Sequence, residues 1–155
     1  MVWRKPCVES VLAHRVERSA LVNFSAQQMY DLVNDIEAYP QFMDGCSGAT
    51  ILTRGDDWVE ARLTLHKAGV QQSFVTRNQL QPPHAMVMNL VDGPFKYLRG
   101  VWRFTPLGEL ACKVSFELEF ELQNRLLGMA LGKVFESIGN QQVDALCARA
   151  KHVYG

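Results

Sequence analysis

A run of alternating apolar and polar residues constrains this chain more than any other feature. In residues 111–123, Val114, Phe116, Leu118, Phe120 and Leu122 fall on one face of an extended strand. Lysine, serine and glutamate fill the positions between them, so the opposite face is polar. Period-two alternation is typical of a strand with one buried and one solvated face. The segment therefore predicts a strand in a sheet that is dry on one side only.

The same alternation continues through most of the chain between residue 50 and residue 123. Short clusters of glycine, proline and aspartate divide this region into six strands, at residues 55–57, 67–69, 82–83, 92–94 and 106–108. Strands that follow one another through short turns pair in antiparallel fashion. We therefore expect an antiparallel meander, preceded by a loop at 44–49.

Helical signals flank this meander. A first strand is predicted over 14–24, and Ser25 then begins a capping box for a short amphipathic helix. Pro40 ends that helix or separates it from a second turn. After Asn124 the apolar spacing returns to 3.6 residues and continues to about Tyr154, which predicts one long helix. The expected fold class is α+β: a curved antiparallel sheet of about seven strands wrapped around a long C-terminal helix, with two short helices after the first strand.

Three glycines interrupt the predicted terminal helix, at positions 128, 132 and 139. Each costs about 1 kcal/mol relative to alanine in a helix interior. Two explanations are open: close packing of the helix on the sheet, or a pliable lid that approaches something bulky and then moves.

Composition places the chain among ordinary globular domains. Of its 155 residues, 48% are apolar and 21% are charged, which suits one domain with a sizeable core. No apolar run approaches the ~20 residues that cross a bilayer, and residues 1–12 lack the apolar stretch of a signal peptide. We expect a cytoplasmic protein in which residues 1–12 form a flexible extension and residues 13–155 form the folded domain.

No catalytic or metal-binding constellation is evident in the residue pattern. The four cysteines and four histidines are dispersed, with no CxxC and no HExxH-type pair, which argues against a disulfide framework and a zinc site. General acid–base catalysis needs a histidine or carboxylate held inside a cavity beside a partner. We therefore predict neither catalytic residues nor a metal site.

The stretch after residue 94 sorts its aromatic and basic residues by face. Within the predicted strand 97–105, Trp102 and Phe104 fall on one face, whereas Arg99 and Arg103 fall on the other. A site for single-stranded nucleic acid needs rings and cations on the same accessible surface. The pattern argues against such a site and favours a buried aromatic face.

Charge is balanced overall but unevenly distributed. The net charge is zero, yet residues 62–103 hold six cations against one aspartate, and residues 31–60 hold seven acids against one arginine. The cations form either a solvated sheet face or a surface that docks onto phosphate, for which local charge matters more than total charge. On the second interpretation, the predicted phosphate-binding patch comprises Arg62, Lys67, Arg77, Lys96, Arg99 and Arg103.

Four segments carry a family resemblance: "YPQFMDGC" (39–46), "KAGVQQSFVTRNQL" (67–80), "LVDGPFKYLRGVWRFTPL" (90–107) and "FELEFELQNRLLGMALGKVFE" (116–136). They resemble the START-like family that contains coenzyme Q-binding proteins and the bacterial ribosome-association toxin. The resemblance runs from about residue 15 to the C-terminus. It implies a helix-grip fold of the polyketide cyclase-like type, in which the sheet and the long helix enclose an apolar cavity.

Two functions follow from this resemblance. The sequence looks closer to the bacterial branch, which implies binding to the large ribosomal subunit and a block of subunit association. The predicted phosphate-binding patch would then contact ribosomal RNA. Other members bind ubiquinone and support respiration, which implies a cavity ligand such as ubiquinone or another isoprenoid lipid, with no cofactor required. The alternatives are a lipid-binding chaperone without ribosome contact and, ranked lower, an aromatase or cyclase-type enzyme. An antitoxin partner and transient contact with a membrane are compatible with the resemblance.

The dry face supplies the predicted cavity wall. Its aromatic and methionine side chains adapt readily to a flexible apolar tail, although the same residues also suit a plain core. We expect the turn of Asp92, Gly93 and Pro94 to shape the cavity mouth. The predicted lining residues are Phe42, Phe74, Met86, Met88, Leu90, Phe95, Trp102, Phe104, Phe116, Leu131 and Phe135.

Overall fold

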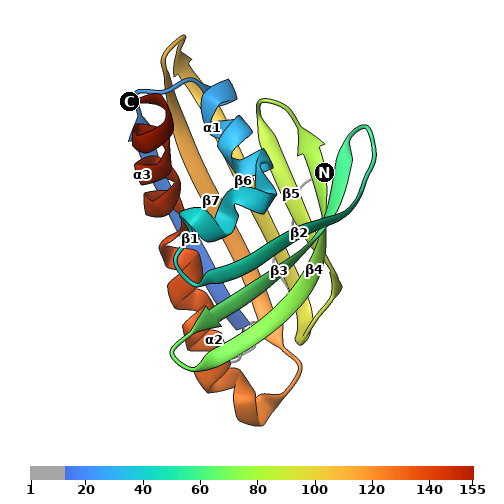
Figure 1. The fold of residues 1–155 in the computed structure, drawn as a ribbon. Coiled ribbons are helices and arrows are strands. Elements are labelled where there is room, and N and C mark those ends of the chain that lie inside the picture. Colours follow the sequence, from blue (N-terminus) through green and yellow to red (C-terminus); the bar gives the residue numbers. More distant parts are fainter. Residues whose placement is uncertain (1–12) are drawn as a thin grey trace.

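A curved sheet of seven antiparallel strands forms the body of the molecule. The structure, a computed structural model, describes residues 13–155, so the predicted extension of residues 1–12 lies outside the described residues. The strand order is β1-β7-β6-β5-β4-β3-β2, and the sheet curves around the C-terminal helices (Figure 1). The strands are β1 (Ala13–Val22), β2 (Cys46–Arg54), β3 (Trp58–Lys67), β4 (Val70–Gln81), β5 (Ala85–Asp92), β6 (Phe95–Gly108) and β7 (Ala111–Leu122).

The predicted alternation holds in the longest strands. Val114 and Phe120 of β7 are fully buried on the inner face, and Phe116 lies opposite Trp102 of β6 on that same face. The number of strands and their antiparallel pairing are therefore as the sequence pattern predicted.

Two boundaries differ from the prediction. The segment 44–49 is not entirely a loop, because β2 begins at Cys46 and pairs with β3 from there. The expected turn at 106–108 was also wrong: β6 continues through Pro106 to Gly108, and the turn lies at Glu109 and Leu110. Pro106 has no amide hydrogen to donate to the neighbouring strand, and a register shift between Pro106 and Gly108 accommodates it in the sheet.

Two short helices follow β1, as predicted. In α1 (Ala26–Asn34) the capping box is complete: the Gln28 amide donates to Ser25 Oγ at 3.1 Å, and the Ser25 amide donates to Gln28 Oε1 at 2.9 Å. The second is a 3₁₀ helix, η1 (Ile36–Gln41), with Pro40 inside it.

The predicted long helix bends at Gln141. It divides into α2 (Arg125–Asn140) and α3 (Gln142–Tyr154), which follow one another along one side of the sheet (Figure 1). At the bend the Gln141 amide donates to Ile138 O, three residues earlier, at 3.1 Å. The chain therefore turns more tightly here than in an α-helix, where the amide donates to the fourth residue back. The bend gives each half its own contact with the curved sheet.

Two hydrophobic clusters lie between the helices and the sheet. The α3 core is the larger and includes fully buried Met29, Val33 and Val114 together with Leu146 and Ala150 of α3. The α2 core lies under the other half of the helix and consists of Phe74, Phe95, Leu98, Phe120, Leu122, Phe135 and Ile138.

Close packing accounts for two of the three helix glycines. A Cβ atom on Gly132 would lie 2.1 Å from His14 Nε2, and one on Gly139 would lie 3.1 Å from Val16 Cγ2. Among the atoms that the structure describes, the nearest to a Cβ on Gly128 is Leu122 Cβ, at 3.8 Å. The sheet therefore explains glycine at 132 and 139, while nothing in the structure explains it at 128.

Candidate functional site

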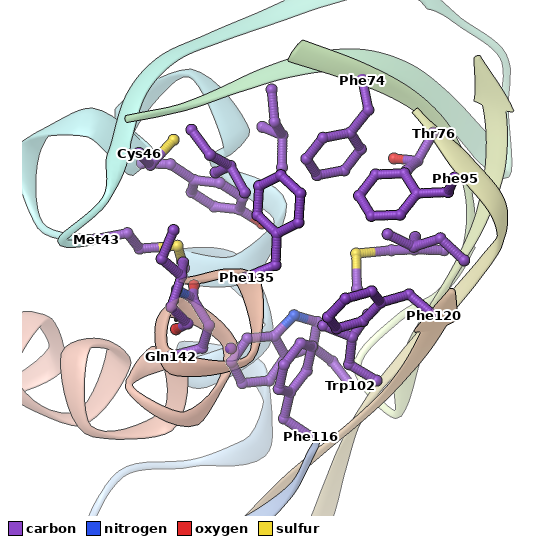
Figure 2. Close-up of a pocket in the computed structure, with 18 residues that line it drawn as sticks. Met43, Cys46, Phe74, Thr76, Phe95, Trp102, Phe116, Phe120, Phe135 and Gln142 are labelled. Atoms are coloured by element: carbon purple, nitrogen blue, oxygen red, sulfur yellow. Dashed lines mark hydrogen bonds between the residues drawn. The ribbon is translucent and has the colours of Figure 1, made fainter. Parts of the chain in front are cut away.

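A cavity of about 90 Å³ lies between the sheet and the C-terminal helices, where the two cores meet. Figure 2 shows aromatic rings from β4, β6, β7 and α2 gathered around it. Six of the predicted lining residues do line it: Phe74, Met88, Phe95, Trp102, Phe116 and Phe135.

The other five predicted lining residues lie elsewhere. Met86 and Phe104 are almost fully buried in the α3 core, and Phe42 lies under the guanidinium group of Arg149 at 5.2 Å. Leu90 and Leu131 pack at the margin of the α2 core. The dry face is longer than the cavity, so a position on that face does not determine whether a side chain reaches the void.

The wall also contains residues that were not among the predicted lining residues. Leu63, Leu65, Leu118 and Phe120 lie on dry strand faces, so alternation alone could have found them. The remaining lining residues have no separate sequence signal. Whether they reach the cavity depends on the bends of the loop and helices, or on which dry-face positions border the void. These are Tyr39, Met43, Cys46, Thr76, Leu98, Ile138, Gly139 and Gln142.

Aromatic contacts hold the wall in place. Phe95 meets Phe74 and Phe120 edge to face, with ring centroids 5.4 and 5.7 Å apart, and the ring of Phe135 lies 5.4 Å from that of Phe95. Edge-to-face contacts between rings contribute about 0.5–1.5 kcal/mol beyond the area that they bury. The α2 core is therefore ordered around the void rather than collapsed into it.

The polar groups at the cavity are few and already have partners. Thr76 Oγ1 donates to Asn78 Oδ1 at 2.8 Å, the Tyr39 hydroxyl donates to a backbone carbonyl, and Gln142 Nε2 donates to Ile138 O at 2.9 Å. Burial raises the pKa of the Tyr39 hydroxyl and of the Cys46 thiol, so both are uncharged at neutral pH. The lining residues include no histidine and no carboxylate. The cavity is suited to binding an apolar group and offers no acid–base pair.

The cavity is small for a lipid in this conformation. An engineered apolar cavity of roughly 150 Å³ admits benzene, and pockets for drug-sized ligands measure about 300–1,000 Å³. A wall of rings and thioethers fits an isoprenoid chain in its chemistry, but a volume of about 90 Å³ requires the cavity to widen before one enters.

Polar contacts tie α2 to both sides of the sheet. On the β1 side, His14 Nδ1 lies 2.9 Å from Glu136 Oε2. On the β3 side, Lys67 Nζ lies 3.5 Å from Ser137 Oγ and 3.3 Å from Gln141 Oε1. We call these the α2 ties. They join partly exposed groups, and contacts of that kind contribute about 1 kcal/mol or less.

The predicted mouth turn packs behind the wall. None of Asp92, Gly93 and Pro94 lines the cavity. Gly93 has a φ of 152°, and a Cβ there would lie 2.6 Å from the Cβ of Phe74. The turn therefore holds the end of the cavity wall from outside, and a side chain at position 93 would displace Phe74.

Most cations of the predicted patch lie on the outer sheet face, but beside carboxylates. Arg77, Lys96 and Arg103 form ion pairs of 3.3, 3.4 and 3.5 Å with glutamates of neighbouring strands. Arg62 is exposed. Lys67 is on the opposite side, as one of the α2 ties. The outer face thus has mixed charge instead of an unbroken basic surface.

The outer face of β7 is also less exposed to solvent than the alternation of its residues predicted. Glu119 and Glu121 are only 7% and 6% exposed. Their register partners are half-buried Arg99 and Tyr97 of β6. The pKa of Tyr97 is raised by burial and by these two carboxylates. Arg99 therefore belongs to a packed polar cluster, not to an open patch.

Within residues 13–155, no three His, Cys, Asp or Glu side chains are placed to hold a metal ion. No helix in this part of the chain has the length and apolar character needed to cross a membrane.

Comparisons with known proteins agree with this architecture. The chain is 50% identical over 141 residues to a protein of Vibrio cholerae named ribosome association toxin RatA, an alignment that covers 91% of this chain and 98% of that protein. It is 29% identical over 141 residues to coenzyme Q-binding protein COQ10 homolog B of Xenopus laevis, covering 88% of this chain and 58% of that protein.

Among solved structures, the Zhui aromatase/cyclase of Streptomyces sp. R1128 superposes with a TM-score of 0.81 at 17% identity, covering 90% of this chain and 94% of that one. This likeness supports the fold alone. The sequence pattern of the family described as polyketide cyclase / dehydrase and lipid transport matches residues 22–147. The chain therefore belongs to this START-like family.

Proposed function

We propose that this protein is a non-enzymatic, cytoplasmic inhibitor of translation that binds the large ribosomal subunit and prevents its association with the small one. The observation that carries the proposal is the 50% identity to a ribosome association toxin over 98% of that protein's length. A neutral cavity lined by neither histidine nor carboxylate also favours binding over catalysis.

The outer sheet face is the surface that we assign to the ribosome. Arg77 and Arg103 have side chains that are 53% and 54% exposed, and Lys96 is 72% exposed. Their ion pairs are long and the cations themselves are exposed, so RNA phosphates can compete with the glutamates for these cations. Contact of this kind weakens steeply as salt rises, because binding releases counterions from the RNA.

A mixture of separated ribosomal subunits and purified protein tests the proposal. We expect that joined ribosomes fail to form on a density gradient, and that the protein travels with the large subunit at low but not at high salt. Normal reassociation at stoichiometric protein would refute the proposal for this chain.

Charge reversal tests the assigned surface. The double substitution Arg62→Glu and Arg103→Glu should abolish co-sedimentation with the large subunit while the fold stays intact. Reversal at Arg99 is a poorer test, because it would place a third carboxylate beside buried Glu119. Lys133→Glu is the matched control, since Lys133 is exposed on α2. Equal co-sedimentation of both variants would mean that the outer face is not the contact.

A second candidate function is binding of ubiquinone or a related isoprenoid lipid, with or without ribosome contact. The apolar cavity and the 29% identity to a coenzyme Q-binding protein favour it. Extraction of the purified protein into organic solvent, followed by mass spectrometry, should recover such a lipid. Protein free of lipid that also fails to take up ubiquinone from detergent would exclude this candidate.

A further inference from the structure

Exposed apolar side chains gather at one end of the molecule. Among the described residues, eight large apolar side chains are exposed, and five of them belong to the end formed by the β6–β7 turn, the end of β1 and the end of α3. We call this the hairpin end. Its five residues and their exposures are Leu21 (74%), Leu107 (58%), Leu110 (72%), Val153 (47%) and Tyr154 (36%).

Strand register places the three leucines together. Leu21 of β1 lies opposite Lys113 of β7, close to Leu107 at the end of β6 and to Leu110 in the β6–β7 turn. Figure 1 shows this turn projecting past the end of α3, with the C-terminus at the same end of the molecule.

The end of α3 is fixed beside them. The Tyr154 hydroxyl donates to Gln28 O at 2.9 Å, and its ring lies 5.9 Å from that of Phe24, two residues after β1. Tyrosine of this kind, with its ring half exposed and its hydroxyl bonded, is typical of surfaces where an apolar and an aqueous phase meet.

Charged side chains surround the apolar ones. Lys113 and Lys151 are exposed, and neither forms an ion pair with any of the residues that the structure describes. The carboxylates of this end are Glu109, in the turn itself, and Asp31, near the Tyr154 hydroxyl. Apolar groups at a tip with lysines behind it match a bilayer, in which phosphates lie outside the acyl chains.

The shape of the hairpin end favours a deformable partner. A stable protein–protein contact needs about 800 Å² of complementary surface on each side, whereas the hairpin end presents five apolar side chains from the ends of β1, β6 and α3 and from the β6–β7 turn. A bilayer requires no complementary shape, and it accepts leucines that project singly. We propose that the hairpin end attaches this protein to a phospholipid bilayer, with Leu107 and Leu110 entering the interface and Lys113 and Lys151 meeting lipid phosphates.

Flotation with vesicles tests this attachment. Wild-type protein should float with phosphatidylcholine vesicles, and more strongly when they are rich in phosphatidylglycerol. Leu107→Glu with Leu110→Glu should reduce the bound fraction at least about tenfold, because two apolar contacts are lost and two charges must approach lipid. Both positions are exposed, so the variant should unfold at the wild-type temperature.

The matched control is Val91→Glu with Met129→Glu. These residues are 52% and 65% exposed, and they lie away from the hairpin end, on β5 and α2. The control should float like wild type. The proposal is overturned if wild-type protein ignores both kinds of vesicle, or if the two double variants bind equally.

Two other partners are outcomes of the same experiment. If the Leu107 and Leu110 variant binds vesicles normally but no longer blocks subunit reassociation, the hairpin end is a ribosome contact and the bilayer proposal fails. If wild-type protein instead dimerises in sedimentation velocity and this variant does not, while vesicles stay unbound, a second copy is the partner. Failure of the ribosome proposal alone leaves vesicle binding unaffected, so the two proposals fail separately.

Discussion

The two halves of the C-terminal helix face the same sheet with different interiors. Under α3 the interior is filled, and Leu146 and Ala150 are fully buried against α1 and the sheet. Under α2 the interior contains the cavity, with Phe135 and Ile138 at its wall. At its two margins α2 is joined to the sheet by the polar α2 ties.

The two halves of the helix therefore have different roles. The filled half holds the domain together, because close-packed apolar contacts contribute most to stability. The half above the cavity borders the void and is fastened at its margins by weak polar groups, so it is the half that we expect to move. We therefore expect the cavity to widen by displacement of α2, with the bend at Gln141 as the hinge.

Truncation in the filled half should produce the largest effect. Leu146→Ala should lower the free energy of unfolding by about 3–5 kcal/mol, because it leaves a void in close-packed surroundings. Denaturant titration measures this loss. Exposed Ala148→Ser on the same helix should change stability little, and a loss below about 1 kcal/mol for Leu146→Ala would contradict the filled interior.

Truncation at the cavity wall should cost less for similar chemistry. Phe135→Leu should lower the free energy of unfolding by about 1–2 kcal/mol, since one side of the ring already faces a void. Ligand retention should fall at the same time, measured as the amount of lipid that is released on dilution. A loss as large as that of Leu146→Ala would remove the distinction between the halves.

Alanine at two of the helix glycines should have opposite effects on stability, according to how closely other atoms approach each position. Gly132→Ala should destabilise the protein by about 1 kcal/mol, because the new methyl group displaces the His14 ring and outweighs the gain in helix propensity. Gly128→Ala should stabilise it by up to about 1 kcal/mol, since the nearest atom leaves room. Thermal unfolding of the two variants should shift in opposite directions, and shifts in the same direction would contradict the packing account.

Loss of an α2 tie should have the smallest effect on stability and a visible effect on access. Lys67→Ala should change the free energy of unfolding by less than about 1 kcal/mol. It should also speed the uptake of a fluorescent ubiquinone analogue, because α2 then moves more freely. Lys133→Ala is the control on the same helix. Unchanged uptake in Lys67→Ala would mean that α2 is not the part that opens.

Periodicity and capping determined the element order by themselves. Alternation in residues 111–123 is a local property of the strand, and the box of Ser25 and Gln28 spans one helical turn, so both could be read from the chain alone. The six predicted residues that line the cavity share a simpler property: they are large and lie on a dry face. Residues chosen on that property also included Met86 and Phe104, which serve the filled core.

Only the tertiary structure decided where the void lies and which charges are available. The bend at Gln141 brings Ile138 and Gln142 to the cavity, and a bend depends on contacts with distant strands instead of local spacing. Likewise Lys67 and Arg99 are ordinary cations in sequence, yet one ties α2 and the other packs beside buried Glu119. Burial and pairing depend on residues far apart in the chain, and the pattern of one strand contains no information about them.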